Sequence, residues 1–250
     1  MPGQPHFQRT LATVILIPGA LLLLSNPLAA QQKYVTQWDV YTGYAFLNSP
    51  KIGLFENGFQ GQLGYRVRTW VSLGFDYSLT AGDLTITPDL LPAALQQQLG
   101  AQLGQMIKAG LIPASYSLTV PAHSITNSFA AGPQFAYRHF QKVTIFIRPS
   151  VGAIREGATP KPTDAVATAI VKELAPAGHK TDWQGFYGIG GGFDINFSKH
   201  FALRTQADYV WDHLFNDLLQ DGRWTTRFSV GPCFNFGKNV AATKPLALRH

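Results

Sequence analysis

Apolar and polar residues alternate with a period of two over long stretches of this chain, and the clearest stretch is its last one, residues 224–236. Small or polar residues, Arg227 among them, separate the apolar ones, so the pattern predicts a β-strand. A strand of this length with large apolar groups on one face and a charge on the other is typical of a tilted membrane strand. The large apolar residues are Trp224, Phe228, Val230, Phe234 and Phe236.

The same alternation predicts seven earlier strands. Short turns at residues 68–70, 138–141 and 198–200 alternate with longer loops at 48–57, 81–123, 155–182 and 212–222. In an up-and-down barrel this places all short turns at one end and all long loops at the other. We therefore predict an all-β fold, an eight-stranded antiparallel up-and-down transmembrane β-barrel. The strands are expected at 38–47, 58–68, 71–80, 128–137, 143–152, 183–197, 201–211 and 224–236.

Two of the long loops contain helical rather than alternating patterns. Leucines recur every four residues from Leu91 to Leu103, which predicts a helix over about 93–109. Val166 and Ile170 mark a short helix in the loop 155–182. We expect the apolar stripe of the first helix to pack against its own domain. Within the strands, Pro133 and Pro149 lack a backbone donor and so indicate bulges or strand ends.

The first 30 residues have the pattern of a signal peptide. A basic start precedes an apolar run from Leu11 to Leu24, and Asn26 to Ala30 resembles a cleavage site with small residues. The run is shorter than the roughly 20 residues that an uncleaved membrane anchor needs. We expect a signal peptide over residues 1–30, a barrel domain over 31–237 and a C-terminal tail over 238–250.

Composition supports a membrane barrel and argues against nucleic-acid binding. Only 14% of residues are charged, 12% are aromatic, and glycine occurs 24 times, which indicates a β-rich chain with little charged surface. The net charge is +6, but the basic residues are scattered singly rather than clustered on one face. A soluble lipocalin-like barrel would need a larger polar outer face than this chain offers.

If the aromatic face points to lipid, the opposite face lines the lumen and carries charges at two heights. Eight strands enclose an interior just wide enough for side chains, where an unpaired charge costs several kcal/mol. We therefore predict a lumen closed by ion pairs, with Asp208 near Arg227 and Asp39 near Arg66. The layer near the periplasmic end comprises Asp39, Arg66, Asp194 and Arg204, and the layer at mid-height comprises Asp76, Arg148, Asp208 and Arg227.

Residues 38–236 resemble the small eight-stranded outer-membrane barrels of the OmpA and OmpX kind. The segment 229–236 is similar to the signal of such strands, which has the order polar, any, Gly, any, any, apolar, any, apolar. The resemblance implies location in the bacterial outer membrane, contact with its lipid, and recognition by the barrel-assembly machinery during biogenesis. The family usually stops at the terminal aromatic, whereas this chain continues from Gly237 to His250. The implied assembly signal consists of Ser229, Gly231, Phe234 and Phe236.

Other candidate sites have simpler interpretations. The glycines at 188 and 190–192 lie within a strand and lack the Lys-Ser/Thr of a phosphate loop, so they make room for bulky luminal neighbours or a bend. The histidines have no metal-binding spacing, and the single cysteine, Cys233, is expected to fill space in the lumen. We expect no metal and no cofactor.

The expected function is a structural or surface-interaction role, with the two helix-bearing loops as external parts that contact a partner of unknown identity. A narrow porin-like channel for small solutes is the alternative. A lipid-modifying enzyme of the outer membrane is a third hypothesis, for which His123 with Ser124, or His213 with Asp212, would be the only candidates. Neither pair has an identifiable third catalytic partner, so we expect no enzyme activity.

Overall fold

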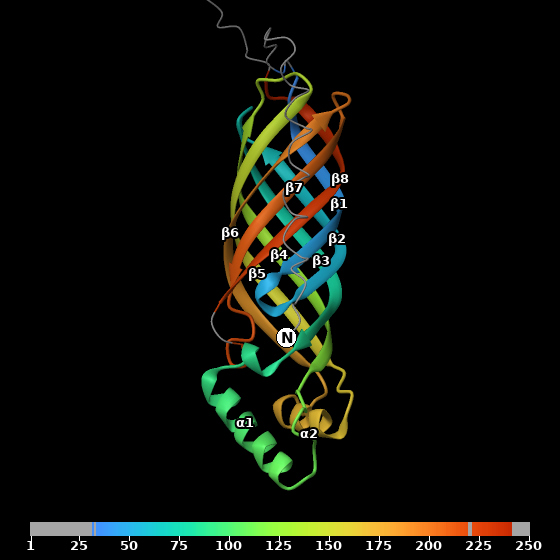
Figure 1. Cartoon of the computed structure of the whole chain (residues 1–250). Coiled ribbons are helices and arrows are strands. Elements are labelled where there is room, and N and C mark those ends of the chain that lie inside the picture. The colour runs from blue at the N-terminus through green and yellow to red at the C-terminus, as the bar shows by residue number, and fades with distance from the viewer. Residues whose placement is uncertain (1–31, 33, 220–221, 242–250) are drawn as a thin grey trace, which may run out of the picture.

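The computed structural model describes residues 32, 34–219 and 222–241. Eight antiparallel strands form one closed barrel in sequence order, and β1 pairs with β8 to close the wall (Figure 1). This confirms the predicted fold class. The predicted signal peptide, residues 1–30, lies outside the described residues. The strands are β1 (Thr36–Ser49), β2 (Leu54–Arg66), β3 (Val71–Ile86), β4 (Val120–Tyr137), β5 (Val143–Pro160), β6 (Lys180–Asn196), β7 (Phe201–Asp212) and β8 (Arg223–Asn239).

Both predicted helices are present, and both lie beyond the same end of the barrel (Figure 1). They are α1 (Ala93–Lys108), between β3 and β4, and α2 (Ala165–Leu174), between β5 and β6. Two short 3-10 helices, η2 (Pro50–Ile52) and η3 (Pro88–Leu90), lie in the connections at this end. Within the described residues, no helix is both long and apolar enough to cross a membrane.

The strands are longer than predicted at the end that carries the helices. β3 and β4 remain paired as far as Ile86 opposite Val120, and β5 and β6 as far as Ala158 opposite Lys180. The loop expected at 48–57 shrinks to the turn 50–53, because Gly53 adopts a left-handed conformation with φ 62°. At roughly 3.3 Å per residue and a tilt near 40°, strands of 18 residues rise roughly 45 Å. The apolar band of such barrels is only about 25 Å tall, so the wall continues well beyond the membrane.

The prediction of bulges or strand ends at Pro133 and Pro149 is wrong. Both prolines lie inside continuous strands, and the pairs Ala131–Val151 and Phe135–Ile147 on either side share one register. That register sets the two prolines opposite each other. The two missing donors therefore weaken the same short part of one ladder instead of two separate parts.

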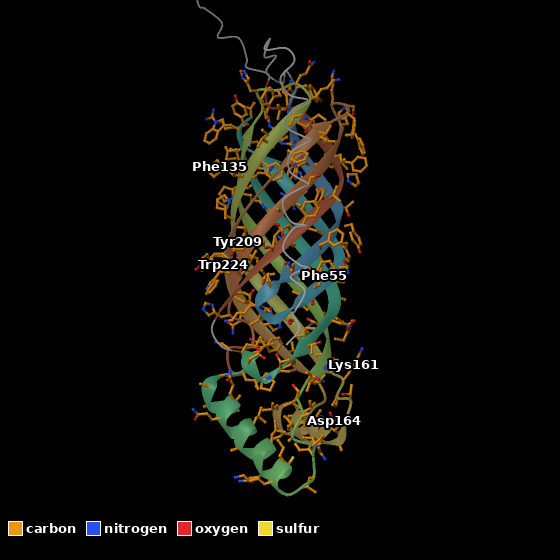
Figure 2. All side chains as sticks on the ribbon, in the orientation of Figure 1. Phe55, Phe135, Lys161, Asp164, Tyr209 and Trp224 are labelled. Atoms are coloured by element: carbon orange, nitrogen blue, oxygen red, sulfur yellow. The ribbon has the colours of Figure 1, made fainter. Side chains whose placement is uncertain are left out.

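A band of aromatic and aliphatic side chains covers the outside of the barrel (Figure 2). Tyr209 and Trp224 stack with their ring centroids 4.3 Å apart, and Phe55 and Phe135 project outward from other strands. Tyr187 and Ile189 of β6 are more than half exposed. Large apolar groups in contact with the surroundings over most of the wall match a barrel surrounded by lipid.

The polarity of the wall reverses at the helix-bearing end. Leu54, Leu84 and Ala122 point inward and form an apolar cluster, while Asp83 and His123 are exposed outside and lie 2.9 Å apart. Beyond this cluster, at the far side from the lumen, α1 and α2 contribute side chains to one apolar cluster. Their shared core confirms that the apolar stripe of α1 packs within its own domain, and it contains Leu91, Leu99, Leu118, Val120, Ala167 and Ile170.

Candidate functional site

The most highly organised polar region of the molecule is the barrel lumen, and a closed square of ion pairs occupies its middle. Arg148 of β5 and Arg227 of β8 each contact both Asp76 of β3 and Asp208 of β7. The four N–O distances are 2.9, 2.9, 3.1 and 2.8 Å. Arg227 also donates hydrogen bonds to Ser78 and Ser128. The square therefore connects strands on different sides of the wall, and it includes the pair Asp208–Arg227 that the sequence suggested.

A second group of ion pairs lies nearer the short turns. Arg204 forms a bidentate contact with Asp194, at 2.7 and 3.0 Å, and also reaches Asp39 at 3.2 Å. Arg66 lies 2.9 Å from the other oxygen of Asp39 and donates to Asn235. All four predicted residues of this layer are thus brought together. Because Arg204 comes from β7 and Asp39 from β1, the contact between them passes across β8.

Glycines beside the acids make room for both layers. A Cβ atom on Gly64 would lie 2.6 Å from Asp39 Oδ2, and one on Gly190 would lie 2.0 Å from Asp208 Oδ1. Cys233 is fully buried in the lumen beside Tyr41 and Ala202. These positions contribute space and packing to the lumen.

A third charged layer, missed by the sequence analysis, lies near the helix-bearing end. Arg223 contacts Glu156 and, at 3.0 Å, Asp212. Glu56 accepts hydrogen bonds from Thr80 and Thr126, at 2.6 and 3.0 Å. All four charged residues are at most 3% exposed, and acids outnumber bases three to one. In this layer the acidic and basic residues do not balance, unlike in the two layers nearer the short turns.

The missed layer was assigned to loops or to a strand edge, although its positions continue the inward alternation of their strands. Glu56 is in phase with Gln60 and Gln62 of β2, and Asp212 is in phase with Asp208 of β7. Extending each strand by a few residues in the same phase would have identified all four residues. The turn-forming residues around 48–57 and the apolar inward neighbours at this end obscured that signal.

The residues of the predicted assembly signal lie along the last part of β8. Phe234 and Phe236 point outward and are 52% and 46% exposed. Ser229 points inward and accepts a hydrogen bond from Tyr41. A Cβ on Gly231 would lie 2.1 Å from the carbonyl oxygen of Thr42, so the glycine permits close approach of β1. β8 itself continues to Asn239, two residues past the expected end of the barrel domain, and the part of the predicted tail from 242 lies outside the described residues.

The structure separates the residues of both candidate enzyme pairs. His123 contacts Asp83 on the outside, whereas its neighbour Ser124 points inward and donates to Glu156. Asp212 is buried against Arg223, while the ring of His213 lies against Trp211. Neither His–Ser nor His–Asp geometry of the kind used in nucleophilic catalysis is formed by these pairs. Among the described residues, no group of three or more His, Cys, Asp or Glu side chains is arranged to hold a metal ion.

An apolar cavity of about 90 Å³ lies between the third charged layer, which contains Glu156, and the helices. Leu84, Leu118 and Ile170 line it from the barrel and both external connections, and Glu156 lies at its border. Water gains little in such a cavity, because a buried water needs two to four polar partners. The helices and the apolar residues around this cavity lie over the helix-bearing end of the lumen (Figure 1).

No protein-family model and no curated protein matches the chain. Among solved structures, it is similar to Ail, the attachment invasion locus protein of Yersinia pestis, at 14% identity over 81% of this chain and 99% of that chain, with a TM-score of 0.46. For Neisserial surface protein A the values are 10% identity, 80% and 96% coverage, and a TM-score of 0.47. For OprG of Pseudomonas aeruginosa the identity is 7%, the alignment covers 83% of this chain and 99% of that chain, and the TM-score is 0.45.

The geometry of the chain itself identifies a small eight-stranded barrel of the bacterial outer-membrane kind. Its wall is closed, so no sheet edge is left without backbone partners in lipid. Its outward band is apolar and aromatic, its lumen is polar, and three of its four short turns lie at the end opposite the helices. The protein is therefore an outer-membrane β-barrel, and α1 and α2 lie at the end opposite the turns 67–70, 138–142 and 197–200.

Proposed function

We propose that this barrel is a non-conducting anchor that presents α1 and α2 to a partner outside the cell. The observation that carries the proposal is the square formed by Asp76, Arg148, Asp208 and Arg227. Its ion pairs connect four strands, and each of its side chains is at most 4% exposed. Opening a path for ions would require buried charges to separate, which costs several kcal/mol per uncompensated charge.

The external helices support the second half of the proposal. They share a compact core of their own, so the extension is an ordered surface rather than a set of flexible loops. The outer face of α1 is formed by alanine, glycine and glutamine, and Lys108 is the one charged residue of the helix. Such a surface has little charge with which to steer a partner, so recognition would rest on shape and on hydrogen bonds from the glutamine amides. Contact with membrane lipid and recognition by the assembly machinery complete the proposed set of partners, with no nucleic acid among them.

Single-channel recording tests the closed lumen. The purified protein is inserted into planar bilayers, and its folding is verified by a gel shift without boiling. We expect no steady conductance. A conductance of the size of a trimeric porin would refute the closed lumen, and small discrete steps would favour the narrow channel for small solutes instead.

Labelling on intact cells tests the presentation of the helices. Gln98 is exposed on α1, Gln141 is exposed at a short turn, and the native Cys233 is fully buried. With a membrane-impermeant maleimide, Gln98→Cys should react on intact cells and Gln141→Cys only after permeabilisation. The opposite result would reverse the orientation.

Lipid A from cells with and without the gene should have the same mass spectrum, and a difference would favour the lipid-modifying enzyme.

A further inference from the structure

At the end opposite the helices, the barrel opens into a cavity of about 480 Å³, which we call the vestibule. Its volume lies within the range of about 300–1,000 Å³ that is typical of small-molecule sites. Of the residues that the structure describes, four basic ones line it and no acidic one does. The basic residues are Arg66, Arg138, Lys142 and Lys199.

The nearby luminal acids do not balance this charge. Asp39 and Asp194 are already paired with Arg66 and Arg204 in a layer that contains two acids and two bases. Among the described residues, no carboxylate lies within 4.0 Å of Arg138, Lys142 or Lys199. The vestibule therefore contains three basic groups beyond those needed to balance the luminal layer.

Arg138 is held in place by neutral acceptors alone. Its Nε donates to the carbonyl oxygen of Thr69 at 2.9 Å, and its Nη1 donates to Gln32 and Thr144 at 3.3 and 3.0 Å. Burial, and then the positive charge of Arg66, lower the pKa of Arg138 to about 10. The side chain is thus still charged at neutral pH, and an anion beside it would relieve both effects.

Arg66 adds a second guanidinium group to the lining of the vestibule. Its side chain is only 3% exposed, it lines the vestibule, and its Nε has no hydrogen-bond partner. Its other two nitrogens are used by Thr36, Asp39 and Asn235. Because Nε is enclosed by protein, Arg66 contributes to the vestibule through its positive charge.

From these observations we infer that the vestibule binds a phosphate group. A phosphate offers several oxygens to donors that converge from different strands, and it pairs well with guanidinium groups. The group has two possible sources, free phosphate that enters through the vestibule and the headgroup of a phospholipid. A second cavity of about 240 Å³ shares Gln32, Val35 and Arg138 with the vestibule and is lined by the exposed Trp70 and Tyr137. This side cavity offers a headgroup a route to Arg138 from the lipid-facing side.

The test uses the full mature chain in micelles of dodecyl maltoside, a detergent without phosphate, titrated with inorganic phosphate by calorimetry at constant ionic strength. The double variant Arg138→Gln/Lys142→Gln should weaken binding by at least about tenfold, because charge-assisted hydrogen bonds are lost. Arg68→Gln is the matched control, since Arg68 is exposed at the same end of the barrel but does not line the vestibule. Its affinity should equal that of the unchanged protein.

A second arm distinguishes the two sources. In micelles that also contain phosphatidic acid, a bound headgroup should abolish the calorimetric signal of inorganic phosphate, whereas a site for free phosphate should keep it. Either result supports a phosphate site, provided that the double variant has lost affinity. Absence of phosphate binding in the phosphate-free micelles, or equal weakening by Arg68→Gln, would overturn the inference.

Discussion

The same eight strands form one barrel whose two ends differ in which face of the wall is polar. In the membrane-spanning part, the outside is apolar and the inside is filled by ion pairs, such as those between Arg148 and Asp208. At the outer end, the inside contains Leu54 and Leu84, and the outside carries the exposed pair Asp83–His123. The strands and their register are continuous through the transition.

This difference shows that solvent, and not strand geometry, decides which face is polar. Inward and outward positions keep the same phase along β3 from Asp76 to Leu84, but the polarity of the inward residues changes. Lipid requires an apolar exterior, whereas water permits a polar exterior and rewards an apolar core. We therefore expect the boundary of the membrane to lie near the transition between the two patterns.

The largest expected effect concerns assembly into the membrane, and it compares the loss of outward apolar side chains on β8 with the same loss on another strand. Phe234→Ala combined with Phe236→Ala should strongly reduce the folded protein in the outer membrane, while synthesis and export continue. The physical reason is that the proposed assembly signal loses both of its apolar positions. Cell fractionation with gel shift without boiling measures the result.

The matched control for assembly is Ile145→Ala combined with Ile147→Ala on β5. These residues also face outward and are 42% and 55% exposed, so a similar apolar surface is lost from another strand. The control should assemble nearly normally. Equal losses in both variants would mean that lipid contact in general, and not the signal on β8, limits assembly.

The second effect compares an ion pair inside the membrane-spanning part with one outside the outer end. Asp208→Ala leaves Arg148 and Arg227 each with one acidic partner fewer in a buried site, and should lower the free energy of unfolding by about 3–5 kcal/mol. Asp83→Ala removes an exposed pair with His123 and should change it by less than about 0.5 kcal/mol. Urea unfolding in lipid vesicles, followed by tryptophan fluorescence, measures both. Similar small losses would indicate a hydrated lumen and favour the channel.

The comparison also explains how much could be predicted from the sequence. Alternation predicted the eight strands and the two charged layers nearer the short turns, because lipid makes the outward face almost uniformly apolar. A repeat of about four residues predicted both helices. Alternation failed at Glu56 and Glu156, which lie beside turn-forming residues or at the start of a long insert that the sequence pattern assigns to loops. It also could not locate the vestibule, because Arg138 and Lys142 belong to a short turn whose pattern does not show which way its side chains point.

The third effect is confined to the outer end. Leu99 is 5% exposed in the core shared by α1 and α2, so Leu99→Ala should destabilise the packing of the two helices by about 2–5 kcal/mol. Limited proteolysis should then cut the extension faster, while the gel shift of the barrel is unchanged. Leu111→Ala, at a position 74% exposed, is the control and should not change the rate of cleavage. Loss of the gel shift in Leu99→Ala would show that the two regions fold as one unit.

The smallest effect tests the start of α2. The Asp164 carboxylate accepts a hydrogen bond from the backbone N–H of Ala167 at 2.8 Å and one from the Tyr116 hydroxyl at 3.0 Å. The bond from Ala167 lowers the pKa of Asp164 below its ordinary value of 3.8. A lowered pKa means that the ionised cap contributes fully above pH 3.8 and that the contribution is lost as the pH falls through the lower, folded-state value.

Asp164→Asn separates the charge of this cap from its hydrogen bond. Asparagine caps helices about as well as aspartate but does not titrate, so protection of the Ala167 amide from hydrogen exchange should stay the same above pH 4. Below that pH, protection in the unchanged protein should fall relative to the variant, because only the aspartate becomes protonated. Asp164→Ala should lower protection at every pH. A constant ratio between the unchanged protein and Asp164→Asn down to pH 2 would show that the negative charge adds nothing to the cap, and that α2 is held by its apolar core with α1 alone.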